Sequence, residues 1–208
     1  MKRFLILLIL TLALLGGLAV SAVAQADEAE AYFAGGCFWC MEPPYDDVEG
    51  VKETISGYTG GSVDNPSYRQ VVRGGTGHHE AIKIVYDPST VSYEDLLYIF
   101  WRNVDPLDGG GQFCDRGDHY TTAVFYANEE QRRLAEETKG EIAGRFDEPI
   151  VTDIEALDEF YVAEEYHQNY YEKNPARYSF YRASCGRDAR LQELWGSEGG
   201  THSVPSGG

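Results

Sequence analysis

The chain has 208 residues, of which 43% are hydrophobic and 25% are charged, and its formal net charge is −17. This length suits one globular domain, which can bury a sizeable core and needs no disulfide or metal to fold. An acidic chain without a basic stripe repels phosphate backbones, so the composition excludes nucleic acid as a partner.

The N-terminus has the layout of a secretory signal peptide. Two basic residues precede an apolar run over 4–20, and a small-residue stretch follows that ends at Ala26. This order predicts a signal peptide over 1–26, cleaved after Ala24 or Ala26. We therefore expect an exported protein, periplasmic or secreted, without stable membrane association after cleavage. The alternative is a membrane anchor through an uncleaved N-terminal segment, because the apolar run is nearly long enough to span a bilayer.

The body of the chain mixes strand and helix patterns without a strict βαβ repeat. Alternating apolar residues and turn glycines predict strands over 30–36, 51–61, 81–88, 119–127 and 149–157. Helices are predicted near Cys37, after the cap Ser92, from Asn128 to Gly144, and over 158–174 before Pro175. This mixture predicts an α+β fold with helices packed on a mainly antiparallel sheet.

Two prolines, Pro43 and Pro44, interrupt the helix that is expected near Cys37. Since a proline deep in a helix removes a backbone hydrogen bond, the first turns are kinked or the regular helix begins later than Cys37. We expect the folded domain to occupy 27–196. The tail over 197–208 is rich in Gly, Ser and Pro, a composition that predicts disorder.

Cys37 and Cys40 are three positions apart and directly follow a glycine pair. If Cys37 lies at a helix N-terminus, the free N–H groups and the helix dipole favour its thiolate, which is the form that attacks. A cysteine three residues further on can then close a disulfide with it. From this motif alone, a structural bridge and a zinc half-site are alternatives. The zinc site needs a second pair of ligands, which the isolated Cys114 and Cys185 do not offer.

Glu80 follows a glycine-rich loop at the start of an apolar strand. A partly buried carboxyl there has a raised pKa and acts as an acid near neutral pH, although a water-facing glutamate is the alternative. The preceding His78 and His79 point to opposite faces of an extended chain, so we do not expect them to bind one metal ion. Tyr68 and Tyr120 lie in or beside loops, where a hydroxyl points into a cleft or simply packs.

A series of motifs, in order along the chain, closely resembles the peptide methionine sulfoxide reductases of the A class. They are GCFWC at 36–40, SGYTGG at 56–61, NPSY at 65–68, TGHHEA at 76–81, GGQFCDRG at 110–117, AEEYHQ at 163–168 and CGRDARLQELWG at 185–196. The resemblance covers essentially all of 31–196 and implies a ferredoxin-like α/β sandwich with long loops. This family restores methionine from its sulfoxide.

The resemblance also implies the role of each residue at the reacting centre. Cys37 attacks the sulfoxide sulfur and Glu80 protonates the sulfoxide oxygen. The hydroxyls of Tyr68 and Tyr120 hydrogen-bond that oxygen as it gains charge. Asp115 helps to hold the polar network through water.

The neighbouring residues Phe38 and Trp39 are implied to form an apolar pocket for the terminal methyl group of the substrate. After methionine leaves, the nucleophile is a sulfenic acid, which a second thiol converts to a disulfide. Cys40 and Cys185 compete for this resolving role, and Cys114 is predicted to be non-catalytic. The GCFWC form is a variant, because family members often have glycine at the position of Cys40.

The resemblance finally implies the substrates and partners. We expect a monomer that reduces methionine S-sulfoxide in oxidised proteins, as the free amino acid and in small methyl sulfoxides. It needs no metal or organic cofactor, because a thioredoxin-like reductant supplies electrons as thiols. One competing class is a thioredoxin-like dithiol-disulfide oxidoreductase, but the order of predicted elements does not fit its βαβ core. An acidic secreted binding module would leave the cysteines and Glu80 unused.

Overall fold

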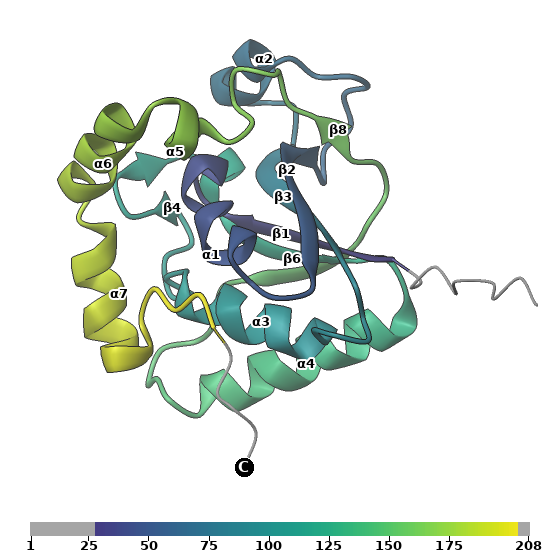
Figure 1. Ribbon diagram of the computed structural model, residues 1–208, viewed down its shortest axis with the longest axis vertical. Helices are drawn as coiled ribbons and strands as arrows, with labels where there is room; N and C mark the ends of the chain where they lie inside the picture. Colours follow the sequence, from purple (N-terminus) through teal and green to yellow (C-terminus); the bar gives the residue numbers. More distant parts are fainter. Residues whose placement is uncertain (1–27, 204–208) are drawn as a thin grey trace, which may run out of the picture.

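Figure 1 shows the fold of residues 28–203, the part of the chain that this computed structural model describes. The predicted signal peptide over 1–26 lies outside the described residues. Among residues 28–203, no helix combines the length and the apolar composition that crossing a bilayer requires.

Two sheets are present in the described residues. The larger sheet has the order β7-β6-β1-β3-β2-β8 and the smaller one pairs β4 with β5. The strands are β1 (Ala29–Gly35), β2 (Val51–Thr59), β3 (His79–Tyr86), β4 (Gly111–Gln112), β5 (Asp115–Arg116), β6 (Thr122–Tyr126), β7 (Asp153–Ala156) and β8 (Tyr161–Val162). All neighbouring pairs are antiparallel except β6 and β7, which are parallel.

Helices connect and cover the strands of the larger sheet. The α-helices are α1 (Pro43–Asp46), α2 (Tyr68–Arg73), α3 (Tyr93–Arg102), α4 (Glu129–Ala143), α5 (Tyr170–Lys173), α6 (Pro175–Ser184) and α7 (Arg187–Trp195). Three short 3-10 helices are η1 (Phe38–Cys40), η2 (Asp118–Tyr120) and η3 (Gly196–Glu198). In Figure 1, α5, α6 and α7 follow one another along one side of the molecule.

The central elements have the ferredoxin-like order. Along the chain they read β1-α1-β2-β3-α3-β6. In space the strands lie in the order β6-β1-β3-β2, and each strand is antiparallel to its neighbours, so that β1 and β2 on either side of β3 run in the same direction. This is the β-α-β-β-α-β arrangement in which β3 lies between the parallel strands β1 and β2. The predicted α+β fold is therefore confirmed.

The main hydrophobic core lies between the sheet and α3. The ring of Phe33 on β1 packs against the ring of Phe100 on α3, with 5.1 Å between centroids. Behind them, Nε1 of Trp101 donates to Oγ1 of Thr138 at 3.0 Å, which joins α3 to α4. Because side chains alternate along a strand, Tyr32 belongs to a second, smaller cluster of buried residues.

The helix caps that the sequence predicts are present. Oγ of Ser92 accepts from the backbone N–H of Asp95 at 3.1 Å, and the carboxylate of Asp95 accepts from the backbone N–H of Ser92 at 2.9 Å. At the start of α4, Oδ1 of Asn128 accepts from the N–H of Gln131 at 3.0 Å. Each cap satisfies N–H groups that a helix leaves unpaired, so both helices begin where the sequence indicates.

The helix predicted over 158–174 is wrong. This stretch contains β8, an irregular segment and the short α5, and Asn169 adopts a left-handed φ of 50° that breaks a helix. Gln168 bonds the backbone of β2 instead, because its Oε1 accepts from the N–H of Ser56 at 2.8 Å. Pro175 begins α6 rather than ending a helix, since proline is well tolerated at the first helical position. Helices α6 and α7 were not predicted.

Near Cys37 the chain forms only the three-residue η1, and the regular α1 begins at Pro43. Of the two alternatives that the prolines left open, the later start is the one observed.

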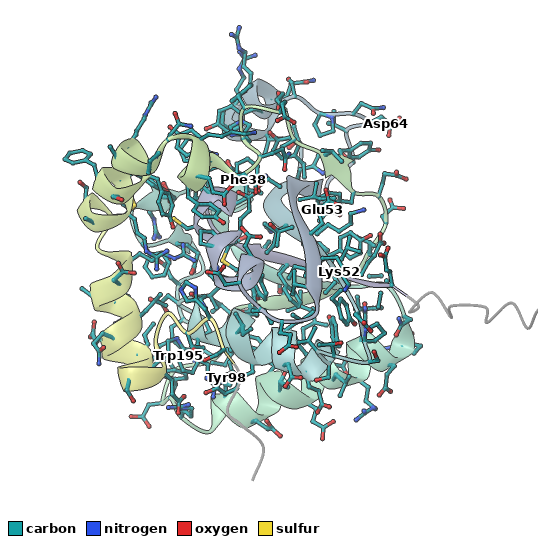
Figure 2. All side chains as sticks on the ribbon, in the orientation of Figure 1. Phe38, Lys52, Glu53, Asp64, Tyr98 and Trp195 are labelled. Atoms are coloured by element: carbon teal, nitrogen blue, oxygen red, sulfur yellow. A yellow bond between two sulfur atoms is a disulfide. The ribbon has the colours of Figure 1, made fainter. Side chains whose placement is uncertain are left out.

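The ordered chain continues past the boundary expected at 196. Glu198 accepts from Nε of Arg102 at 3.2 Å and from Nη1 of Arg145 at 2.8 Å. The Arg102 guanidinium lies 3.8 Å from the ring centroid of Tyr98 and 5.4 Å from that of Trp195, and Figure 2 labels both rings. Residues 197–203 are therefore part of the fold, while 204–208 lie outside the described residues.

Candidate active site

A cavity of about 170 Å³ collects most of the predicted site residues. Its lining comprises Cys37, Phe38, Trp39, Tyr68, Glu80, Asp115, Tyr120 and Tyr181. The first seven were predicted and Tyr181 was not, while the predicted resolving residues Cys40 and Cys185 lie outside the lining. A larger hollow of about 390 Å³ between α3 and α4 contains none of the predicted residues.

The end of β1 places Cys37 in this cavity. Gly36 has a left-handed φ of 84°, which turns the chain sharply out of the strand. A Cβ on Gly35 would lie 2.5 Å from Sδ of Met41, so the preceding position also requires glycine. The thiol that follows is buried, with 6% of Cys37 exposed. The glycine pair thus lets a buried cysteine follow the strand directly.

Glu80 lies on β3 and is 1% exposed. Its Oε2 accepts from the backbone N–H of Phe38 at 3.2 Å, which brings the carboxyl beside η1. Burial raises the pKa of Glu80 to about 8, against the lowering effect of the Phe38 N–H. The carboxyl is therefore protonated at neutral pH and can donate a proton into the cavity.

Two phenols stand beside this carboxyl. Tyr68 is the first residue of α2 and Tyr120 is the last residue of η2. The Tyr120 hydroxyl lies near that of Tyr68 and near the Glu80 carboxyl, and its proximity acts to lower the pKa of both groups. Burial raises the pKa of Tyr68 to about 12 and that of Tyr120 further, so both stay neutral. Three neutral donors therefore converge on one cavity.

Tyr181 on α6 links the cavity to Asp115. Its hydroxyl donates to Oδ2 of Asp115, and Tyr181 lines the cavity together with Cys37. Burial raises the pKa of Asp115, against the hydrogen bond from Tyr181. No sequence signal singled out Tyr181, because it is one of 15 tyrosines and α6 was not predicted.

Cys37 and Cys40 form a buried pair of free thiols. Burial, a hydrogen bond with Cys40 and the nearby Glu80 raise the pKa of Cys37. The hydrogen bond with Cys37 lowers the pKa of Cys40 to about 6, aided by Arg187 and Arg182. Of the two buried thiols, Cys40 is therefore the more acidic. The condition for a helix-stabilised Cys37 thiolate is met only by the three-residue η1, and the N–H of its first residue bonds Glu80.

The two aromatic residues after Cys37 are held by the AEEYHQ segment and its continuation. Trp39 stacks face to face on Tyr170, with 3.7 Å between ring centroids and 6° between planes. Its Nε1 donates to Nδ1 of His167 at 3.0 Å. The ring of Phe38, which is labelled in Figure 2, is buried and lies 4.9 Å from that of His167. The position of the aromatic wall thus depends on a segment more than 120 residues away in sequence.

The same segment also holds Tyr68. Glu164 accepts from the backbone N–H of Tyr68 at 2.9 Å and from the hydroxyl of Tyr58 at 2.9 Å. These bonds fasten the start of α2 to the sheet. The AEEYHQ motif contributes to the family resemblance, but no role was predicted for Glu164 or His167.

Cys114 and Cys185 form a disulfide, with 4.9 Å between their Cα atoms. Cys114 is exposed, and Cys185 caps the C-terminus of α6. The Sγ of Cys185 lies 4.0 Å from Oδ2 of Asp115, directly behind the cavity lining. One predicted resolving residue is therefore bonded to the cysteine that was predicted to be non-catalytic.

The ligand atoms of Cys114, Asp115 and Cys185 lie within 4.8 Å of one another, the spacing of a metal site. Their two sulfurs are bonded to each other, so in this state they offer no thiolate to a metal.

The two histidines before Glu80 hydrogen-bond different partners. A ring nitrogen of His78 bonds the carbonyl of Val63 at 2.8 Å, and one of His79 bonds the hydroxyl of Thr121 at 2.9 Å.

The chain is similar to known proteins over most of its described length. Residues 29–199 match the profile of the family described as peptide methionine sulfoxide reductase. The MsrA of Bacillus licheniformis, also described by that name, is 52% identical over 168 residues, which cover 80% of this chain and 93% of the relative.

Two solved structures have a similar fold. Reduced Mxr1 from Saccharomyces cerevisiae has a TM-score of 0.69 at 29% identity and covers 73% of this chain and 88% of its own. Methionine sulfoxide reductase A of Corynebacterium diphtheriae has a TM-score of 0.66 at 32% identity and covers 73% of this chain and 77% of its own. The profile match, the identity to the bacterial relative and these folds agree, and the chain belongs to the peptide methionine sulfoxide reductase family.

Proposed function

We propose that this enzyme reduces methionine S-sulfoxide, in proteins and as the free amino acid, with Cys37 as nucleophile and Glu80 as acid. One observation carries the assignment of roles. The Cys37 thiol shares a cavity of about 170 Å³ with a protonated carboxyl and two neutral phenols. A sulfoxide placed there would meet a nucleophile at sulfur and proton donors at oxygen.

In the first step, the proton of Cys37 moves to Cys40, and Cys37 attacks the sulfoxide sulfur. Glu80 donates its proton to the oxygen, while Tyr68 and Tyr120 hydrogen-bond it. The net change transfers the oxygen to Cys37, so the substrate sulfur gains two electrons and the thiol sulfur loses two. Methionine leaves, and Cys37 is left as a sulfenic acid.

The aromatic wall selects the substrate. Trp39 and Phe38 line the cavity beside the nucleophile and offer apolar surface to the S-methyl group, which is nearly all that distinguishes this side chain. His167 and Tyr170 hold the indole in place from behind.

The second step uses the neighbouring thiol. Cys40 attacks the sulfenic sulfur and expels water, which closes a Cys37–Cys40 disulfide. If Cys114 and Cys185 have been reduced, Cys185 attacks this disulfide and Cys114 completes the exchange, which leaves the bond seen here and restores both buried thiols. An external dithiol then reduces Cys114–Cys185. Asp115 and Tyr181 connect the two cysteine pairs.

A thioredoxin-like protein is the proposed reductant. Mxr1 of Saccharomyces cerevisiae has been solved in complex with Trx2, and its fold covers 70% of this chain at a TM-score of 0.51. Because the sequence predicts export through a signal peptide over 1–26, the reductant would act outside the cytoplasm. N-terminal sequencing of the protein recovered from its native host tests the cleavage after Ala24 or Ala26.

The decisive experiment compares two activities of the purified protein with dithiothreitol. Methionine formation from methionine sulfoxide tests the proposed reaction, with separate S and R epimers to test the stereochemistry. Insulin reduction tests the alternative, a dithiol-disulfide oxidoreductase. We expect rapid reduction of the S epimer and insulin reduction no faster than with dithiothreitol alone. The opposite pattern would contradict the proposal.

A further inference from the structure

A second cavity, of about 500 Å³, lies next to the active site. Three segments form its walls: the end of α2 over 71–73, the glycine-rich loop over 74–78, and the segment 116–119. We call it the flanking groove. It is larger than the cavity of about 170 Å³ that holds the nucleophile, and neither the reaction nor the aromatic wall uses it.

Each wall of the flanking groove continues a segment that carries a site residue. Tyr68 begins α2, Glu80 follows the glycine-rich loop, and Asp115 and Tyr120 bracket the third wall. The lining of the groove ends at His119 and that of the active site includes the next residue, Tyr120, and the centroids of these two rings lie 4.1 Å apart. A chain that delivers its methionine sulfoxide to Cys37 therefore has this groove beside it.

The floor of the groove is exposed backbone. Gly74 and Gly75 have left-handed φ values of 81° and 83°, and a Cβ on either would meet no atom within 4 Å. Within residues 28–203, the N–H groups of Gly75 and Gly77 donate to no protein acceptor. Free donors beside open space suit the carbonyl groups of an extended peptide.

Arg73 gives the groove a positive charge that can attract an acidic side chain of a peptide. It is exposed in the last turn of α2 and forms no ion pair within the described residues, whereas Arg116 across the groove is held by Asp108. Burial lowers the pKa of His119, which therefore adds no charge at neutral pH. Asp118 lines the groove from the segment 116–119, a different wall from that of Arg73. An acidic side chain beside Arg73 would be attracted, on a protein that otherwise repels acids with a net charge of −17.

We infer that the flanking groove binds the peptide chain next to the oxidised methionine, and that Arg73 favours substrates with an acidic residue there. The inference rests on the proposed function, because it requires the sulfoxide to occupy the cavity at Cys37. The rate of reduction of a protein substrate would then depend on the residues next to its methionine sulfoxide. Free methionine sulfoxide and dimethyl sulfoxide are too small to reach the groove.

The test compares peptides that carry one methionine sulfoxide flanked on either side by Asp or by Lys. For the native enzyme at low salt, we expect kcat/KM to be about two- to fivefold higher for one of the Asp peptides than for its Lys counterpart. Arg73→Gln should abolish this preference and Arg73→Glu should reverse it. High salt should remove it as well.

Arg69→Glu is the matched control, because Arg69 is exposed on the same helix and does not line the groove. It should leave the peptide preference intact. Equal kcat/KM for Asp and Lys peptides with the native enzyme, or equal effects of the two Arg→Glu variants, would overturn the inference. Reduction of dimethyl sulfoxide reports on the proposed function separately, and neither variant should change it.

Discussion

Nε1 of Trp39 donates a hydrogen bond to Nδ1 of His167 at 3.0 Å, although 128 positions separate the two residues. Since Nδ1 accepts this bond, the proton of the neutral imidazole resides on Nε2, which is buried and has no protein partner in the described structure. Burial lowers the pKa of His167 to about 4, so the ring stays neutral across the working range. The histidine therefore orients the indole without taking part in proton transfer.

We expect Trp39→Ala to weaken substrate recognition while leaving the cysteine chemistry intact. An apolar wall against a methyl-sized group contributes about 1–3 kcal/mol, so kcat/KM for methyl sulfoxides should fall about 5- to 150-fold. Alkylation of the cysteines by iodoacetamide should proceed at the native rate. Trp39→Phe keeps an aromatic wall but loses the bond to His167, so its kcat/KM should lie between those of the native enzyme and Trp39→Ala. A parallel fall in alkylation and turnover would mean that Trp39 tunes the thiol instead.

Glu80→Gln should fold normally and lose about a hundredfold or more of its turnover, because an amide supplies no proton to the sulfoxide oxygen. Glu42→Gln is a suitable control. Glu42 is also fully buried, and burial raises its pKa to about 7, but it does not line the cavity. Single-turnover formation of methionine measures both variants. A native rate in a folded Glu80→Gln protein would remove Glu80 from the role of acid.

The pH dependence of the first step follows from the same groups. The pKa of Glu80 is raised to about 8, so the proton donor is present below that pH and is lost above it. The pKa of Cys40 is lowered to about 6, so the thiol pair carries its negative charge above that pH. We expect a bell-shaped profile of the single-turnover rate, with limbs near 6 and 8 that belong to the coupled groups. Cys40→Ser should move the acidic limb to higher pH, because Cys37 then titrates alone.

Glu42 should make the stability of the fold depend on pH. Its carboxyl accepts from Oγ of Ser56 at 2.9 Å, and burial raises its pKa to about 7 from the ordinary 4.5. The folded state thus holds its proton more tightly than the unfolded state. The stabilisation is complete below about pH 4.5 and is lost as the pH rises through 7, by on the order of 3 kcal/mol. Urea unfolding at several pH values measures this loss, and Glu42→Gln should flatten the curve.

The extent to which sequence predicted this molecule depends on how local each signal is. The caps at Ser92 and Asn128 are local, and α3 and α4 begin where those residues indicate. The residues around the cavity came from motifs whose meaning rests on resemblance, and the fold brings them together. Periodicity failed over 158–174, where aromatic and charged residues alternate as in a helix. There, side-chain bonds to β2 outweigh local propensity.

Two features of the site have no local signal at all. Tyr181 reaches the cavity because α6 packs beside η1, and no pattern in the sequence around position 181 predicts that contact. The pairing of Cys114 with Cys185 spans 71 positions, and four cysteines allow three different pairings.

The positions of Cys40 and Cys185 predict which of them attacks the Cys37 sulfenic acid first. Cys40 already contacts Cys37 in the buried pair, and η1 is a short turn that can distort to bring the two sulfurs to bonding geometry. Cys185 is bonded to Cys114 and reaches Cys37 only past Tyr181 and Asp115. We therefore expect Cys40 to resolve the sulfenic acid first, with Cys185 acting later by exchange.

Cys40→Ser should still release one methionine per enzyme without reductant but should accumulate the sulfenic acid, which dimedone labels for mass spectrometry. Cys185→Ser is the matched control. It should form the Cys37–Cys40 disulfide at the native rate, and only its turnover with a protein reductant should be slower. The protein should be reduced before each reaction, since the Cys114–Cys185 bond otherwise hides any contribution from Cys185. If Cys40→Ser forms its disulfide at the native rate while Cys185→Ser stalls as the sulfenic acid, Cys185 is the resolving residue and the proposed order is reversed.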